Sequence, residues 1–224
     1  MRNRLFFLSI IFLGVLLIQG SIYADRGHVV FVSGKVEVEN KGRWVQARLD
    51  MMIEEASRIR TGKNGLIILR LGDGAIIKLK ASSQIILSKL DNHILIDVES
   101  GAIFSRLQKL RADQSYKIRA QTFVAAVRGT EFFFTYGRRK KEGADYWLCV
   151  NEGIVNVTES EKASNADVQA GEGVHAPIGK KIDRPRHYEW TKKLNWNMDA
   201  ARGPVDDKVD ISDAYGELLK RTYD

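Results

Sequence analysis

Short apolar stretches alternate with turn residues from His28 to about Pro177, and this pattern predicts a succession of β-strands. The stretches are about 4–7 residues long and recur about every 8–12 residues, as in a β-sandwich, a roll or a solenoid of strands. They cover residues 28–32, 35–39, 66–71, 75–79, 84–87, 94–98, 115–119, 131–136, 145–150, 154–157 and 173–176. Helical spacing is scarce in this region, so we expect an all-β fold of many short strands.

Glycine-containing turns separate the predicted strands. Glycine adopts the positive φ angles of tight turns without a steric penalty. Such turns are predicted at Ser33-Gly34, Asn64-Gly65, Asp73-Gly74, Glu152-Gly153 and Gly171-Glu172-Gly173. The stretches on either side of Asp73-Gly74 predict a hairpin, and because both are apolar on both faces we expect central strands that are covered on each side.

The pattern changes near residue 179, where a basic connector begins. Beyond it, residues 187–201 carry apolar side chains at a spacing of four, which predicts a helix, and a second short helix is expected over 212–221. We therefore divide the chain into a leader (1–24), a β domain (25–178) and a connector with a short C-terminal helical extension (179–224).

Two tryptophans, Trp190 and Trp196, lie in the first predicted helix. An exposed pair of tryptophans is unfavourable on a protein surface. They are interpreted either as docking onto the β domain or as contacting a partner.

The first 24 residues have the order of a secretory signal peptide. Two arginines precede an apolar run over residues 5–18, and Ala24 offers a small residue for cleavage before Asp25. A helix over this run would span about 21 Å, at ~1.5 Å per residue, against a hydrocarbon core of about 30 Å. Cleavage is therefore favoured, and we expect an exported protein, or a membrane-tethered one if the leader is retained.

Composition adds two constraints. Loss of the leader removes two arginines, so 33 basic residues face 28 acidic ones and the formal net charge falls from +7 to +5. This excess is spread along the chain and is too small to indicate a nucleic-acid partner, although it suits anionic surfaces. The one cysteine, Cys149, cannot form an internal disulfide and is expected to be buried as a small apolar residue.

Several motifs, in this order and spacing, resemble the FecR domain. Arg58-Ile59-Arg60-Thr61-Gly62 matches one element of the family and Leu71-Gly72-Asp73-Gly74 is similar to one of its turns, and Val127-Arg128-Gly129-Thr130-Glu131-Phe132 is the most specific piece. Val150-Asn151-Glu152-Gly153 follows, and the resemblance covers roughly residues 29–176. It identifies eight structural motif residues: Thr61, Gly62, Asp73, Gly74, Gly129, Thr130, Glu152 and Gly153.

The resemblance also implies a setting. The best-known members of the family are bacterial inner-membrane regulators that join an external domain to a cytoplasmic segment for binding a sigma factor. Only four residues precede the apolar run here, so we expect the external domain without that segment. Such a domain is implied to relay a protein contact.

Arg128 is the most notable charge in the motifs. It lies between the apolar stretches 123–127 and 132–134, where a guanidinium would need a carboxylate or several carbonyl partners. Two interpretations stay open: a buried strut between two loops, or a contact with a ligand or partner. Gly129 indicates a backbone kink, and Thr130 is expected to hydrogen-bond the turn.

A basic run joins two aromatic-rich strands and consists of Arg138, Arg139, Lys140 and Lys141. It is interpreted either as a solvated hairpin tip or as a basic finger that contacts an acidic glycan, phospholipid head groups or an acidic protein.

The residues offer no framework for catalysis or for a bound metal. The four histidines are isolated, no Cys-x-x-Cys pair exists, and both the Gly-x-Ser-x-Gly elbow and the phosphate loop are missing from the sequence. We therefore expect no cofactor, no metal and no enzymatic activity.

Taken together, the sequence predicts a non-catalytic, periplasmic FecR-type binding module that docks an envelope protein in signalling or assembly. The alternative is a structural protein associated with the cell wall or a glycan, whose partner would be peptidoglycan or an anionic surface. A hydrolase is a distant third hypothesis. The candidate contact residues are Arg128, Arg138, Arg139, Lys140, Lys141, Trp190 and Trp196.

Overall fold

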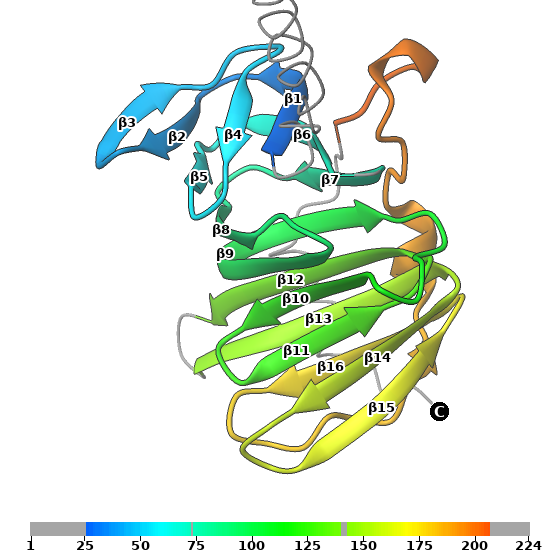
Figure 1. The fold of residues 1–224 in the computed structure, drawn as a ribbon. Helices are drawn as coiled ribbons and strands as arrows, with labels where there is room; N and C mark the ends of the chain where they lie inside the picture. Colours follow the sequence, from blue (N-terminus) through cyan, green and yellow to red (C-terminus); the bar gives the residue numbers. More distant parts are fainter. Residues whose placement is uncertain (1–25, 73, 140–142, 207–224) are drawn as a thin grey trace, which may run out of the picture.

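The structure is a computed structural model, and it describes residues 26–72, 74–139 and 143–206. Within these ranges 17 strands form one connected system, and the helical segments are two short 3-10 turns. Every strand that the apolar pattern predicts is present (Figure 1). The all-β fold class is therefore confirmed.

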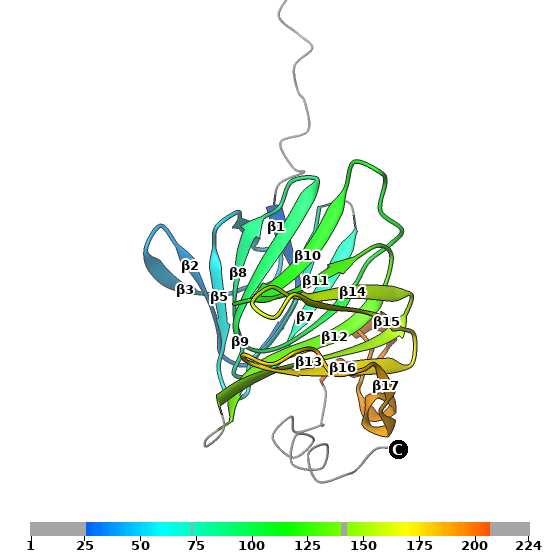
Figure 2. The ribbon, with the colours of Figure 1, turned by 90° about the horizontal axis from the view of Figure 1, so that it is seen from below.

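The strands lie in two layers (Figures 1 and 2). Sheet A has the order β4 (Met52–Glu54), β1 (Arg26–Ser33), β6 (Leu66–Leu71), β7 (Ala75–Leu79), β9 (His93–Arg106), β12 (Glu131–Arg139), β13 (Gly143–Glu152), β16 (Glu172–Pro177) and β17 (Arg186–His187). Sheet B has the order β3 (Arg43–Gln46), β2 (Val36–Asn40), β5 (Arg58–Thr61), β8 (Gln84–Lys89), β9, β10 (Ser115–Ala120), β11 (Phe123–Val127), β14 (Ile154–Glu159) and β15 (Ser164–Gln169).

Strand β9 belongs to both sheets. Its first half pairs with β8 and, in parallel, with β10, whereas its second half pairs with β7 and β12. The change of sheet occurs at Gly101, which has a φ of 88° and whose missing Cβ would lie 2.3 Å from Ser83 Oγ. Only glycine fits there, because a residue with a side chain disfavours this φ angle and its Cβ would clash with Ser83.

The main core lies between the two sheets. Because side chains alternate between the faces of a strand, one apolar face of each sheet points inward. Fully buried core residues of sheet A include Ile67, Leu69, Ile77, Phe134 and Leu148, and those of sheet B include Ile59, Ile85, Leu87, Ile118 and Val157.

The outer face of sheet A is also covered, by the segment 188–205. Tyr188, Leu194 and Met198 are buried against an aromatic cluster on this face, and Val205 is buried with Ile68 nearer to β6. The hairpin β6–β7 is therefore covered on both faces, as its apolar pattern predicts, and the part of the C-terminal extension that the structure describes docks onto the β domain.

The extension is not the α-helix predicted over 187–201. The structure has a 3-10 turn at Glu189–Lys193, an extended stretch, and a second 3-10 turn at Ala200–Arg202. The Oδ1 atoms of Asn195, Asn197 and Asp199 each accept a hydrogen bond from the backbone N–H two residues further on, all at 3.0 Å. These local turns compete with the helical hydrogen bonds, so the prediction was wrong. The second predicted helix, over 212–221, lies outside the described residues.

Candidate functional site

Arg128 lies on the turn between β11 and β12, and its side chain is exposed. It makes no hydrogen bond or ion pair with another residue in the described part of the chain. The interpretation as a buried strut is therefore wrong. The turn directs the guanidinium outward because its neighbours Val127 and Thr130 take the buried positions.

The backbone of this turn is closely packed. Gly129 has a φ of 79°, and a Cβ there would lie 3.0 Å from the Cα of Lys109. Gly153, with a φ of 83°, packs on it from the next family turn: a Cβ on Gly153 would lie 2.7 Å from the carbonyl oxygen of Gly129 and 2.7 Å from Cγ2 of Thr130. Two turns that the sequence singled out thus brace each other.

Thr130 fixes the turn differently from the prediction. Its hydroxyl is buried and makes no hydrogen bond with the residues described, whereas its backbone carbonyl accepts a hydrogen bond of 2.9 Å from the N–H of Leu107. That bond ties the Arg128 turn to the 107–114 loop that follows β9.

The next residue, Glu131, is almost completely buried and is held by two hydrogen bonds and an ion pair. Nε of Arg106 donates to Oε1 over 2.8 Å, Nδ2 of Asn151 donates to Oε2 over 2.6 Å, and Nη2 of Arg106 lies 2.6 Å from Oε1. Arg106 Nη2 also lies 3.1 Å from the carbonyl oxygen of Trp196. The strand that leaves the Arg128 turn is therefore fixed to its neighbours and to the C-terminal segment.

The other motif residues are structural where the structure describes them. Thr61 Oγ1 donates to the carbonyl of Lys80 over 2.6 Å and accepts from the N–H of Ser83 over 2.8 Å. Gly62 donates its N–H to the carbonyl of Lys35 over 2.8 Å. Gly74 has a φ of 122° at the β6–β7 turn, and Glu152 is the exposed last residue of β13. Asp73 lies outside the described residues.

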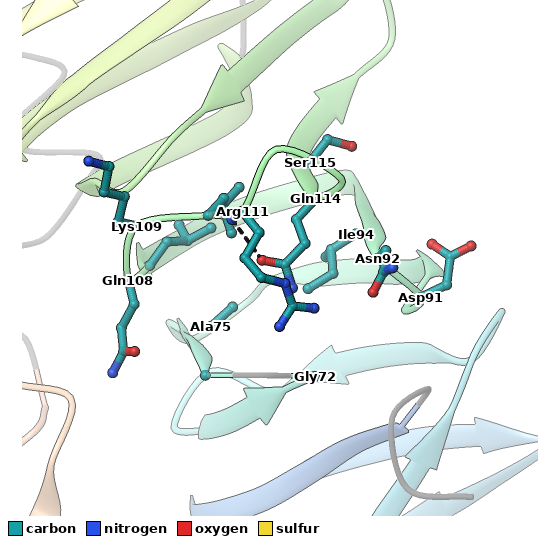
Figure 3. A pocket seen from close by; sticks show the side chains of 13 residues that line it. Gly72, Ala75, Asp91, Asn92, Ile94, Gln108, Lys109, Arg111, Gln114 and Ser115 are labelled. Carbon is teal, nitrogen blue, oxygen red and sulfur yellow. Dashed lines mark hydrogen bonds between the residues drawn. The ribbon is translucent and has the colours of Figure 1, made fainter. Parts of the chain in front are cut away.

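A cavity of about 210 Å³ lies next to the loop that packs on the Arg128 turn, and Figure 3 shows its lining residues. Its walls are the β6–β7 turn, Asp91 and Asn92 before β9, and the 107–115 segment. Lys109 lines the cavity and also packs against Gly129, so one loop contributes to both features.

The cavity combines polar walls with an apolar part formed by Ile94 and Leu107. Its loop is held by a hydrogen bond of 3.0 Å from the N–H of Arg111 to Oε1 of Gln114, drawn in Figure 3. Neither histidine nor cysteine lines it, and no group of three or more potential ligands for a metal ion occurs among the described residues. The cavity therefore offers mainly polar side chains to a small group that enters it.

The remaining predicted contact residues do not join this surface in the part of the structure that is described. Arg138 and Arg139 end β12 and pair with Ala144 and Gly143, while Lys140 and Lys141 lie outside the described residues, as does the side chain of Trp190. Trp196 is half-buried: its ring contacts Phe104 edge-on at 5.3 Å, and its Nε1 donates to the carbonyl of Thr191 over 3.3 Å.

Sequence reasoning missed Lys78, whose side chain is completely buried in sheet A. Its Nζ donates to the carbonyls of Asn195, Asn197 and Val205 over 2.5, 2.9 and 3.2 Å. The sequence did carry a signal for Lys78: it is the one lysine in a strand predicted to be covered on both faces. A buried ammonium requires hydrogen-bond partners, so such a lysine indicates a contact with another segment.

His175 was also missed as part of a cluster. Its Nε2 lies 3.1 Å from Oδ2 of buried Asp145, its Nδ1 lies 3.2 Å from Oδ2 of Asp183, and its ring stacks on Trp147 at 4.3 Å. Asp183 belongs to the basic connector, so the cluster fixes the connector to β13 and β16. Its members are far apart in sequence, which is why no spacing motif marks them.

The fold and site define an all-β protein with a braced, exposed arginine turn. In agreement with the sequence motifs, residues 57–156 match the sequence model of the FecR protein family. The resemblance to that family is thus confirmed over this range. No curated protein sequence matches the chain.

Two crystal structures have the same fold. Both are of a "putative anti-sigma factor" from Parabacteroides distasonis ATCC 8503, with TM-scores of 0.53 and 0.52, identities of 17% and 15%, and coverage of 73% of each chain. Identities this low establish similarity of fold and nothing further. Within the described residues, no helix has the length and apolar character needed to cross a bilayer.

Proposed function

We propose that this chain is a non-catalytic binding module that works outside the cytoplasm and docks an envelope protein in signalling or assembly. The observation that carries the proposal is the exposed Arg128 guanidinium on a turn braced by Gly129 and Gly153. A braced turn loses little backbone freedom when it binds, so the ordering cost is limited to the side chain and more of the interaction with an acidic partner is retained as affinity.

Two further observations support this function. The FecR match includes the Arg128 turn, and the description of the structural neighbours as anti-sigma factors favours a role in signalling through a protein contact. The signal-peptide pattern of residues 1–24 favours export.

The cavity beside the turn favours a partner with a small polar or acidic side chain. Lys109 and Arg111 contribute positive charge, with Arg111 paired to Asp113 at 3.5 Å, and Asp91 is the carboxylate among the lining residues. An acidic segment that contacts Arg128 could place one side chain in this cavity.

Capture from a detergent-solubilised cell envelope tests the proposal. The wild-type chain should retain one envelope protein, and Arg128→Glu should reduce the captured amount at least tenfold, about 1.4 kcal/mol. Lys180→Glu is the matched control, because it reverses another exposed charge on the turn after β16. Equal capture by the two variants would contradict the proposal.

Sedimentation with purified peptidoglycan separates the cell-wall alternative. Binding to the wall that is insensitive to Arg128→Glu, together with no captured protein, would favour the structural role instead.

A further inference from the structure

Strand β3 forms an open edge of sheet B. Its residues pair with β2, and no other described strand is in register with it. The hairpin β2–β3 projects from the body of the domain (Figures 1 and 2). Its two turn residues, Lys41 and Gly42, have φ angles of 51° and 76°, as in a type I′ turn.

The hydrogen-bond pattern shows which backbone groups of β3 point outward. Val45 is opposite Val38, and the N–H of Ala47 donates to the carbonyl of Val36 over 2.8 Å. Bonded and non-bonded positions alternate along an antiparallel pair. The N–H and C=O groups of Trp44 and Gln46 therefore point away from β2.

Strand β3 also carries an exposed apolar side chain, Val45, which is 40% exposed. Two more of the five large hydrophobic residues exposed in the described part of the chain follow it in sequence: Leu49 in the next loop, 60% exposed, and Met52 on β4, 37% exposed. Strand β4 is the edge strand of sheet A, so Val45 is the member of this group that lies on β3 itself. Strand β3 contains no proline or lysine, the residues that commonly protect an edge from pairing.

We propose that β3 pairs antiparallel with β3 of a second copy of this chain, across a two-fold axis at Val45. In this register Trp44 of each copy lies opposite Gln46 of the other, so the outward N–H and C=O groups of both residues are used. The two Val45 side chains face each other, and Arg43 lies opposite Ala47. No like charges are directly opposed, which makes the strand complementary to itself.

Strand β3 is favoured as the pairing edge over β15, the strand at the other edge of sheet B. Strand β15 has no exposed large hydrophobic residue, and it carries the polar pair Asn156–Asp167 beside it. The exposed Val45 side chain and the outward backbone groups of Trp44 and Gln46 coincide at β3, and their symmetric register is the reason for choosing a copy of the same chain.

Sedimentation velocity of the full chain at increasing concentration tests the pairing. The wild-type chain should form a dimer, and Val45→Lys should weaken dimerisation at least tenfold because it places two ammonium groups opposite each other. Mixing the Val45→Lys and Val45→Glu variants should restore a mixed dimer. Ile154→Lys, which alters another exposed residue on β14, should leave dimerisation unchanged.

Amide hydrogen exchange of the wild-type chain gives a second readout that needs no variant. The amides of Trp44 and Gln46 should exchange more slowly as the concentration rises, while that of Val45 should be slow throughout. A chain that stays monomeric up to about 1 mM, the weak limit of specific association, would overturn the proposal. A dimer with unchanged exchange at Trp44 and Gln46, or one insensitive to Val45→Lys, would overturn it as well.

Discussion

The ammonium of Lys78 lies 4.2 Å from the centre of the Phe104 ring, its neighbour across the β7–β9 pair. The same ammonium donates to three backbone carbonyls of the C-terminal segment. A single buried charge thus joins the outer face of sheet A to the segment that covers it. The backbone carbonyls of this segment accept hydrogen bonds from Lys78 and so are not paired within a helix. This agrees with the local turns that residues 195–205 form in place of an α-helix.

Lys78→Met should release this cover. Methionine keeps much of the volume but removes the donor, and buried carbonyls that lose a donor retain their desolvation penalty. We expect the free energy of unfolding, measured by urea titration, to fall by about 2–3 kcal/mol. We also expect faster proteolysis at Lys192 and Lys193. Lys117→Met, at an exposed position of β10, is the control and should change little. Equal stability of the two variants would show that the ammonium does not hold the segment.

Gly153→Ala should be more destabilising than Gly179→Ala. Both glycines have positive φ, 83° and 73°, so each substitution carries a backbone penalty of about 1–2 kcal/mol. A Cβ on Gly153 would also meet the Gly129 carbonyl and Thr130, whereas nothing lies within 4 Å of one on Gly179. In thermal unfolding, the free energy of unfolding should fall by about 1–3 kcal/mol more for Gly153→Ala than for Gly179→Ala. Similar losses would mean that the two family turns do not brace each other.

Asp97 gives stability a defined pH dependence. Burial alone would raise the pKa of Asp97, but hydrogen bonds from Arg119 and Ser88 outweigh it, so the pKa is lowered from 3.8. A carboxyl whose pKa is lowered by folding stabilises the fold at pH values above its pKa in the unfolded chain. This contribution is lost as the pH falls through the pKa in the folded chain.

Asp97→Asn should therefore reduce stability at pH 7. The reduction should be about 1 kcal/mol or less, because Arg119 is partly exposed and the pair is screened. The difference between wild type and variant should shrink as the pH falls below about 4. A difference that stays constant from neutral to acid pH in urea titrations would contradict this assignment.

Cys149 should be chemically inert in the folded chain. Burial raises the pKa of its thiol, and the residue is fully buried between β12 and β16. An aromatic disulfide reagent at pH 8 should react slowly in buffer and rapidly in concentrated urea, because the thiolate forms only when the strands separate. Rapid reaction of the native protein would refute the packing described for this strand.

Much of the fold could be predicted because apolar alternation reports directly on strands. The hairpin β6–β7 has the predicted bounds, and the burial of Cys149 follows from its apolar neighbours. Strands β3, β4, β5 and β15 were missed. They are short or consist mainly of charged and polar residues, so their place in the sheet depends on pairing rather than on pattern.

The site was less accessible to sequence reasoning. The direction of Arg128 depends on how Gly129 and Gly153 pack, and these residues come from separate turns. Lys78 and its carbonyl partners are separated by 117 residues or more. The α-helix was wrongly predicted because a spacing of four takes no account of Asn and Asp side chains that hydrogen-bond to the backbone.

Photo-crosslinking in intact cells tests the proposed function most directly. A photoreactive residue in place of exposed Gln108, in the loop that packs on the Arg128 turn, leaves the arginine itself in place. We predict that it captures one envelope protein, that Arg128→Glu abolishes the capture, and that Lys180→Glu preserves it. Failure to capture any protein, or capture that is unchanged by Arg128→Glu, would contradict the account.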